Sequence, residues 1–142
     1  MILLDTNVLS ELMRSAPDTK VVQWLDAWPE GEVWISAVTV AEIRLGISLL
    51  PVGKRKKLLL DLSEQMFRED FPDRCLPFDC EAAGEYARIV AARVRQGCPI
   101  SVEDGQIAAI ARTAGLALAT RNTKDFSGIT GLKLIDPWTD QE

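Results

Sequence analysis

Histidine is absent from this sequence, and cysteine is scarce. The 142 residues include no histidine and three cysteines, Cys75, Cys80 and Cys98, without paired CxxC spacing. The lack of histidine removes the commonest general base and the commonest transition-metal ligand of proteins. Ser-His-Asp and Cys-His mechanisms are therefore excluded. The odd number of cysteines favours free thiols in a reducing compartment over disulfides or a zinc site.

Long apolar runs, low-complexity segments, internal repeats and linkers are also missing. No run approaches the roughly 18 apolar residues that indicate a membrane-spanning helix, and an acid, Asp5, stands where an export signal would be basic or apolar. We therefore expect a cytoplasmic protein without membrane contact. With 47% hydrophobic and 26% charged residues, the chain has the balance of one domain covering residues 1–142.

The net charge of −5 argues against broad, nonspecific binding to a polyanion, which depends mainly on lysine and arginine. Any contact with nucleic acid must therefore be local. One dense basic cluster, residues 54–57, is typical either of a solvated helix start or of a phosphate contact. Scattered basic candidates near the acids discussed below are Arg44, Arg121 and Lys124.

Short apolar runs alternate with helical patterns along the whole chain. The runs predict strands at 2–4, 32–36, 76–78, 116–120 and 133–135, and the patterns predict helices at 8–13, 18–28, 39–50, 54–71, 81–96 and 102–114. Pro51 and Gly53 separate two of these helices, which indicates a helical hairpin. The alternation predicts an α/β fold with a central parallel sheet of four to five strands flanked by helices, whose functional residues gather at the carboxyl ends of the strands.

Four carboxylates fall near those strand ends. Asp5 directly follows the first strand, and Glu42 lies in the first helical turn after the second. Asp125 lies just beyond the strand at 116–120, and Asp104 is in the first turn of the helix that leads to it. We therefore expect these four acids to converge on one site.

Each acid also has an ordinary structural explanation. Thr39-x-x-Glu42 and Ser101-x-x-Asp104 both fit the capping-box pattern of helix starts. Asp5 is a candidate N-cap for the first helix, with Asn7 as a rival. Helical spacing puts both helix acids at the edges of stripes that should be covered: Asp104 with Ile107, Ala108 and Ala111, and Glu42 with Leu45, Gly46 and Leu49.

The electrostatics of such a cluster point to a metal ion. At separations near 6 Å and an effective dielectric of about 20, each pair of acids repels by roughly 3 kcal/mol. A divalent cation relieves this repulsion, and oxygen ligands without histidine favour Mg²⁺ or Mn²⁺ over zinc. Metal ions held in this way polarise phosphoryl oxygens and activate water. The sequence therefore predicts metal-dependent cleavage of phosphodiesters.

The predicted roles differ among the residues. Asp5 and Asp104 are the expected direct ligands, Glu42 either ligates or orients the attacking water, and Asp125 completes a second metal position. Small polar neighbours are expected to hydrogen-bond to the carboxylates or to a metal-bound water. These neighbours are Thr6, Asn7, Ser36, Thr120 and Asn122, of which Asn7 and Thr120 are the strongest candidates.

Four segments together resemble the PIN-domain ribonucleases, most of all the VapC and FitB type toxins of bacterial toxin–antitoxin pairs. They read MILLDTNV at 1–8, SAVTVAEIRLG at 36–46, EDGQIAA at 103–109 and LATRNTKDF at 118–126. Each motif alone is short, but their order and their helical spacers are specific. The resemblance covers the chain from residue 1 to about residue 138.

This resemblance implies Mg²⁺ held by Asp5, Glu42, Asp104 and Asp125, and endonucleolytic cleavage of RNA. It also implies a homodimer and inhibition by a cognate antitoxin, through which alone the protein would meet DNA. Relatives place the fourth acid either where this chain has Asn122 or where it has Asp125. The four tryptophans suit aromatic anchors in a dimer or antitoxin interface, although core packing explains at least two of them equally well.

Two other functions are compatible with parts of the pattern. A HAD-like phosphatase or phosphotransferase also has an aspartate after its first strand, but it normally needs a second one where this chain has Asn7. A noncatalytic module could use the same acids to bind an ion or a basic peptide.

Overall fold

Five short strands form a parallel sheet at the centre of the protein. The computed structural model describes residues 1–140, so the last two residues of the expected domain lie outside the described part. The strand order is β3-β2-β1-β4-β5, and every neighbouring pair is parallel. This confirms the predicted parallel sheet. The strands are β1 (Ile2–Leu4), β2 (Val33–Ser36), β3 (Cys75–Leu76), β4 (Ala117–Ala119) and β5 (Leu134–Ile135).

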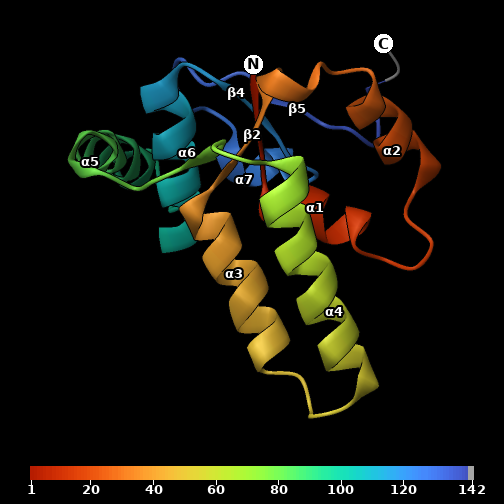
Figure 1. The fold of residues 1–142 in the computed structure, drawn as a ribbon. Coiled ribbons are helices and arrows are strands. Elements are labelled where there is room, and N and C mark those ends of the chain that lie inside the picture. Colours follow the sequence, from red (N-terminus) through yellow and green to blue (C-terminus); the bar gives the residue numbers. More distant parts are fainter. Residues whose placement is uncertain (141–142) are drawn as a thin grey trace.

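Helices cover both faces of this sheet (Figure 1). The expected helices are all present, with ends that move by a few residues. The short helices η1 and α7 were not predicted, and the end of the helix expected at 54–71 is a π-helix, η2. The bounds are α1 (Thr6–Leu12), α2 (Thr19–Asp26), η1 (Glu30–Glu32), α3 (Ala37–Ser48), α4 (Lys54–Gln65), η2 (Met66–Asp70), α5 (Cys80–Arg95), α6 (Val102–Ala114) and α7 (Thr123–Phe126).

Alternate residues of the central strand point into two separate cores. Ile2 and Leu4 belong to the cluster that contains the buried residues of α1, α2 and α3, whereas Leu3 joins the cluster on the side of α5 and α6. All three side chains are fully buried. A strand buried on both faces needs an uninterrupted apolar sequence, which explains why β1 reads as a continuous run rather than an alternating one.

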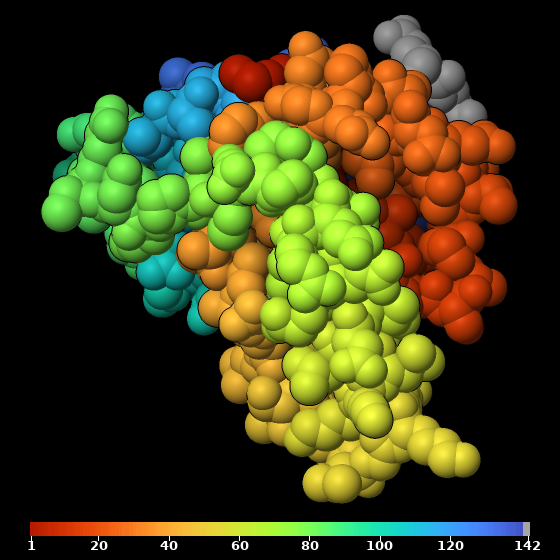
Figure 2. All heavy atoms as spheres, viewed as in Figure 1, coloured from red at the N-terminus to blue at the C-terminus, as the bar shows by residue number. Residues whose placement is uncertain are grey.

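The tip of the predicted hairpin of α3 and α4 projects away from the sheet (Figures 1 and 2). In the basic cluster, Lys56 Nζ donates to the backbone oxygens of Ser48 and Leu50, which closes the turn between the helices. The expectation that the stripe of Leu45 and Leu49 is covered was wrong. These side chains are 60% and 76% exposed, because α3 turns its other face, with Ile43 and Ile47, inward.

The start of α3 also differs from the prediction. Ser36, not Thr39, is the N-cap, and its Oγ accepts a hydrogen bond from the Thr39 backbone N–H at 3.1 Å. Glu42 is therefore not part of a capping box. The cap predicted for α6 is present, because Ser101 Oγ accepts from Asp104 N at 3.2 Å.

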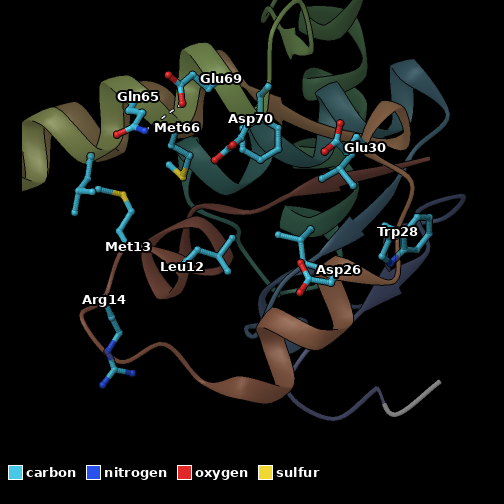
Figure 3. A pocket seen from close by; sticks show the side chains of 14 residues that line it. Leu12, Met13, Arg14, Asp26, Trp28, Glu30, Gln65, Met66, Glu69 and Asp70 are labelled. Atoms are coloured by element: carbon cyan, nitrogen blue, oxygen red, sulfur yellow. Dashed lines mark hydrogen bonds between the residues drawn. The ribbon is translucent and has the colours of Figure 1, made fainter.

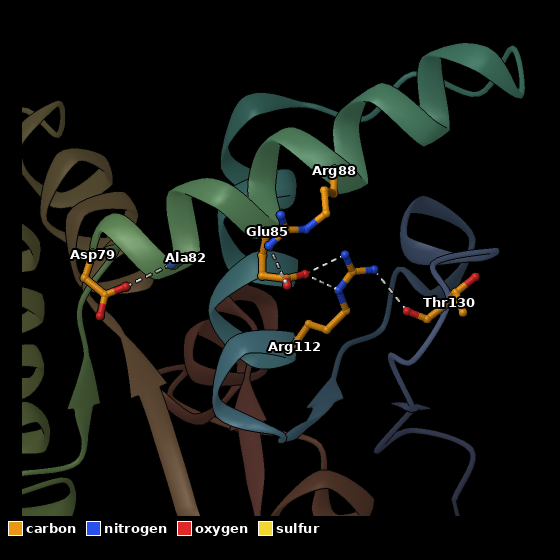
Figure 4. Close-up of polar contacts among 6 residues, drawn as sticks. All are labelled: Asp79, Ala82, Glu85, Arg88, Arg112 and Thr130. Carbon is orange, nitrogen blue, oxygen red and sulfur yellow. Dashed lines mark hydrogen bonds and ion pairs between the residues drawn. The ribbon is translucent and has the colours of Figure 1, made fainter.

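Helix α6, which carries Asp104, is anchored against α5. Two guanidinium nitrogens of Arg112 bind the carboxylate of Glu85, and a third contact joins Arg112 to the Thr130 backbone oxygen (Figure 4). Near the opposite end, Gly105 approaches the ring of Tyr86 so closely that a Cβ there would lie 2.9 Å from Tyr86 Cε2. The helix that presents Asp104 is therefore fixed at both ends.

Candidate acidic site at the carboxyl edge of the sheet

Asp5 lies at the carboxyl end of the central strand and begins α1. Its side chain is 4% exposed. One carboxylate oxygen, Oδ1, accepts from the Thr6 backbone N–H at 2.8 Å. The other, Oδ2, accepts from Thr120 Oγ1 at 2.8 Å and from Asn7 Nδ2 at 3.2 Å. Burial raises the pKa of Asp5, and the negative charge of Asp125 adds to the rise, while these hydrogen bonds oppose it.

Thr120 and Asn7 connect the ends of β1 and β4. Thr120 is fully buried, and its hydroxyl also accepts from Asn7 Nδ2 and from Asn122 N, at 3.2 and 3.0 Å. Asn7 Oδ1 accepts from Arg121 N at 3.2 Å. The residues predicted as supporting neighbours thus form one network around the Asp5 carboxylate.

Glu42 is half-buried on α3 and faces the start of α1. Its Oε1 accepts from Thr6 Oγ1 at 2.8 Å, and Thr6 Oγ1 lies 3.1 Å from Thr39 Oγ1. Thr39 is fully buried, so its role is to support this contact from below rather than to begin the helix. Thr6 thus links the carboxylates of Asp5 and Glu42, because its backbone N–H donates to Asp5 and its hydroxyl donates to Glu42.

Asp104 shows the mutual influence of the acids most clearly. Its pKa is raised from 3.8 to about 6, first by burial and then by the negative charges of Asp5, Asp125 and Glu42, while the Ser101 hydroxyl lowers it. A carboxyl group responds in this way when like charges lie near it in a poorly solvated place. The four predicted acids therefore share one electrostatic environment.

A cavity of about 500 Å³ is the centre of this environment. Asp125 is exposed on α7 and does not line the cavity, whereas Asn122 does. Asp125 acts on the other acids through its charge from the rim. The lining residues are Asp5, Thr6, Asn7, Ser10, Glu11, Arg14, Glu42, Asp104, Arg121, Asn122 and Trp138.

The donor set suits a hard divalent cation, although the present side-chain positions do not form a complete cage. Among residues 1–140, no three acidic or thiol groups lie close enough together to hold one ion. Asp5 accepts three hydrogen bonds, and a carboxylate has about four lone-pair sites, so one site remains on Oδ1. Mg²⁺ and Mn²⁺ require oxygen ligands, and their positive charge relieves the repulsion between the carboxylates. By the chemistry of their oxygen donors, Asp5, Glu42 and Asp104 at this cavity are the residues that would hold such an ion.

Glu11 and Arg14 line the cavity and were not predicted. Glu11 is buried, and its Oε2 accepts from the Asp18 backbone N–H at 2.9 Å and pairs with Arg14 at 3.0 Å. These contacts lower the pKa of Glu11, the Asp18 bond most of all. The sequence did contain a signal, because Glu11 shares a helical stripe with the apolar residues Val8 and Leu12.

A second cavity of about 670 Å³ lies between α1, α2 and the end of α4 (Figure 3). Apolar side chains such as Leu12 and Met66 line it, together with the acids Asp26, Glu30 and Asp70. Burial raises the pKa of Asp70, and nearby carboxylates add to the rise. No pattern in the sequence indicated this cavity.

The structure also places the cysteines and the tryptophans. The three cysteines are free and exposed, as expected for unpaired thiols. All four tryptophans contribute to the cores, with Trp24 buried and the others packed at the edges. No helix within residues 1–140 is long and apolar enough to cross a membrane.

A parallel sheet covered by helices, with acids gathered at the carboxyl ends of its strands, defines a class of α/β proteins whose functional sites lie at that edge. Within that class, the chain belongs to the PIN domain family, whose family model matches residues 2–132. Toxin FitB of Neisseria gonorrhoeae is 44% identical over 99% of this chain and 100% of its own length. VapC ribonuclease Y4jK of Sinorhizobium fredii is 41% identical over 97% of this chain and 98% of its own length.

Solved structures agree with this family. The crystal structure of FitAcB from Neisseria gonorrhoeae superposes with a TM-score of 0.90 at 44% identity, covering 99% of this chain and 100% of that chain. A toxin–antitoxin complex from Klebsiella pneumoniae superposes with a TM-score of 0.70 at 30% identity, covering 96% of this chain and 98% of that chain.

Proposed function

We propose that this protein is a Mg²⁺-dependent endoribonuclease and the toxin of a toxin–antitoxin pair. The observation that carries the proposal is the gathering of Asp5, Glu42 and Asp104 at one cavity, where burial first and then the charges of the neighbouring acids raise the pKa of Asp104 to about 6. A cluster of this kind is costly to the fold and is typical of functional sites. Relatives along the whole chain named as a ribonuclease and as a toxin support the substrate and the biological role.

In this proposal, Asp5 and Asp104 hold the metal ion, Glu42 ligates it or orients the attacking water, and Asp125 contributes to a second position from the rim. A bound Mg²⁺ or Mn²⁺ would polarise the phosphoryl oxygen and favour ionisation of water. Thr120 and Asn7 fix the Asp5 carboxylate by their hydrogen bonds. Asn122 faces the cavity as a neutral partner of the acids.

The proposed partners follow from the relatives and from the surface. The Klebsiella pneumoniae structure is named as a toxin–antitoxin complex, which supports a cognate antitoxin for this chain. We propose that this chain meets DNA only through that antitoxin. A homodimer is supported by exposed apolar side chains on the hairpin of α3 and α4, since large apolar patches mark interfaces. These are Leu45, Leu49, Val52 and Leu58. We place the protein in the cytoplasm, where its RNA substrate occurs.

The decisive test is cleavage of an unstructured RNA by purified protein with Mg²⁺ or Mn²⁺. We expect cleavage that EDTA abolishes and that Asp104→Asn removes. Asp61→Asn is the matched control, because Asp61 is an exposed acid on α4 and the substitution changes the charge equally. RNA binding without cleavage would instead favour a noncatalytic module, and hydrolysis of a phosphomonoester alone would favour a phosphatase.

Sequencing of RNA ends after expression in cells would then identify the target. We expect internal cuts with a shared base context in one class of RNA. Uniform degradation with no preferred position would contradict the proposed toxin role.

A further inference from the structure

Arg121 lies at the rim of the acidic cavity without pairing with its acids. The residue follows Thr120 at the end of β4, and its side chain is exposed. Its backbone N–H donates to Asn7 Oδ1, so its main chain belongs to the network around Asp5. Among the described residues, its guanidinium forms no ion pair with any carboxylate. The positive charge therefore remains available at the mouth of the cavity.

The guanidinium is held instead by an aromatic ring. The Arg121 guanidinium carbon lies 4.8 Å from the centroid of the Trp138 ring, within the range of a cation–π contact. Both residues line the same cavity as Asp5 and Asp104. A guanidinium stacked on a ring keeps the N–H groups at its edge free for a ligand.

Trp138 is itself a fixed platform. The residue is half-buried and packs against the core on the side of α1, α2 and α3. Its backbone N–H donates to Asp136 Oδ1 at 2.9 Å, which shapes the turn that carries it. Two residues further on, Asp140 Oδ2 accepts from Trp24 Nε1 at 3.1 Å and ties this turn to α2. The stack is therefore anchored to the body of the protein.

The other arginine of the cavity is in a different state. Arg14 pairs with the buried carboxylate of Glu11 at 3.0 Å, which offsets its charge. A neutralised guanidinium attracts an anion less than an unpaired one. Of the two arginines that line this cavity, Arg121 is thus the one suited to bind an anionic group.

We infer that Arg121, positioned by Trp138, binds a phosphate of the RNA substrate adjacent to the phosphate that is cleaved. The inference rests on the proposed ribonuclease function. An acidic cavity repels the RNA backbone, so a local cation at its rim is needed to hold the strand while the acids act. Arginine binds phosphate through two parallel N–H groups, and pre-orientation on a ring reduces the entropy lost on binding. A protein segment that enters the acidic cavity would be basic and would be repelled by Arg121, which favours RNA over a protein ligand.

The test measures cleavage kinetics and RNA binding separately. Arg121→Gln is expected to raise KM for a short single-stranded RNA about tenfold, as for loss of a charge-assisted hydrogen bond, while kcat stays near the wild-type value. The slope of log binding constant against log salt concentration should fall by about 0.7, the value for one phosphate contact on a single strand. Trp138→Leu should raise KM in the same direction, and Trp138→Phe should restore most of the wild-type KM because it keeps a ring under the guanidinium.

Arg88→Gln is the charge-matched control. Arg88 lies on α5 and pairs with Glu85, and it does not line the acidic cavity (Figure 4). Its loss should leave both KM and the salt dependence unchanged. Because Arg121 is exposed, its substitution should not prevent folding, which circular dichroism checks for every variant.

Two results would overturn the inference. One is an unchanged KM and salt dependence in Arg121→Gln, including the case in which only binding of the cognate antitoxin weakens. The other is a fall in kcat alone, which would assign Arg121 to the chemical step.

Fluorescence anisotropy with RNA in an Asp104→Asn background measures the contact without cleavage. Wild-type protein that never cleaves RNA would therefore refute the proposed function, while the anisotropy result with Arg121→Gln would still decide the inference.

Discussion

Replacing Asp104 by asparagine should stabilise the protein in buffer that contains EDTA, even though it should abolish cleavage. Asp104 has a pKa of about 6 in the folded protein against 3.8 for an ordinary aspartate, chiefly because of burial and then because of Asp5. A raised pKa means that folding disfavours the ionised form. The stability associated with protonated Asp104 is fully present below pH 3.8 and is lost as the pH rises through about 6. Asparagine cannot ionise and avoids this loss.

The expected magnitude follows from the same values. At about 1.4 kcal/mol per pKa unit, the difference between 3.8 and about 6 corresponds to about 3 kcal/mol above pH 7. Asp104 is only half-buried, so solvent screening reduces this to about 1.5 kcal/mol. The lost charge at the start of α6 costs roughly 0.5 kcal/mol, since helix N-termini favour anions. We therefore expect a net gain of about 1 kcal/mol at pH 8.

Urea denaturation of wild type and Asp104→Asn in EDTA at pH 8 and pH 5 measures this gain. The ionisation part should be about half as large at pH 5, where the folded side chain is mostly protonated and the unfolded one mostly ionised. Asp61→Asn should change the free energy of unfolding by less than about 0.5 kcal/mol at either pH. Equal or lower stability of Asp104→Asn at pH 8 would refute the idea that burial and the neighbouring acids disfavour ionised Asp104 in the folded protein.

Two further substitutions test how the site is supported. Thr120→Val removes the hydroxyl that binds Asp5 Oδ2, which should lower the free energy of unfolding by about 2 kcal/mol and reduce cleavage; wild-type stability in urea would contradict the proposed network. Gly105→Ala places a Cβ 2.9 Å from Tyr86 Cε2 and should cost about 1–3 kcal/mol. If the melting temperature of Gly105→Ala equals that of the wild type, α5 and α6 separate more easily than their packing indicates.

The sheet and the long helices were predictable because their apolar patterns are strong. Buried strands such as 2–4 read as continuous apolar runs, and Gly115 marks the end of α6 with a φ of 71°. The helix α7 was missed because four residues are too short to show a helical period. The start of α3 was misplaced because Ser36 and Thr39 are both good N-cap residues, and only the backbone conformation selects between them.

The site was predictable where topology alone places a residue. Asp5 and Asp104 follow from the rule that functional groups gather at the carboxyl edge of a parallel sheet. The rule does not distinguish between residues that follow the same strand. It therefore did not separate Asn122, which lines the cavity, from Asp125, which does not. The stack of Arg121 on Trp138 depends on how the turn at residues 136–140 folds back, and no local pattern reports such a contact.

Capping and site formation turned out to be compatible roles for the same acids. The Asp5 carboxylate accepts the first backbone N–H of α1, and Asp104 lies in the first turn of α6, which Ser101 caps. The N-terminus of a helix carries a partial positive charge, so it is the place near a strand end where a buried carboxylate costs least. A cluster of acids is therefore less costly there than elsewhere in the protein. For this reason the capping pattern and the metal-site pattern coincide in this sequence. Only the three-dimensional structure, in which several helix starts meet at one edge of the sheet, distinguishes the two roles.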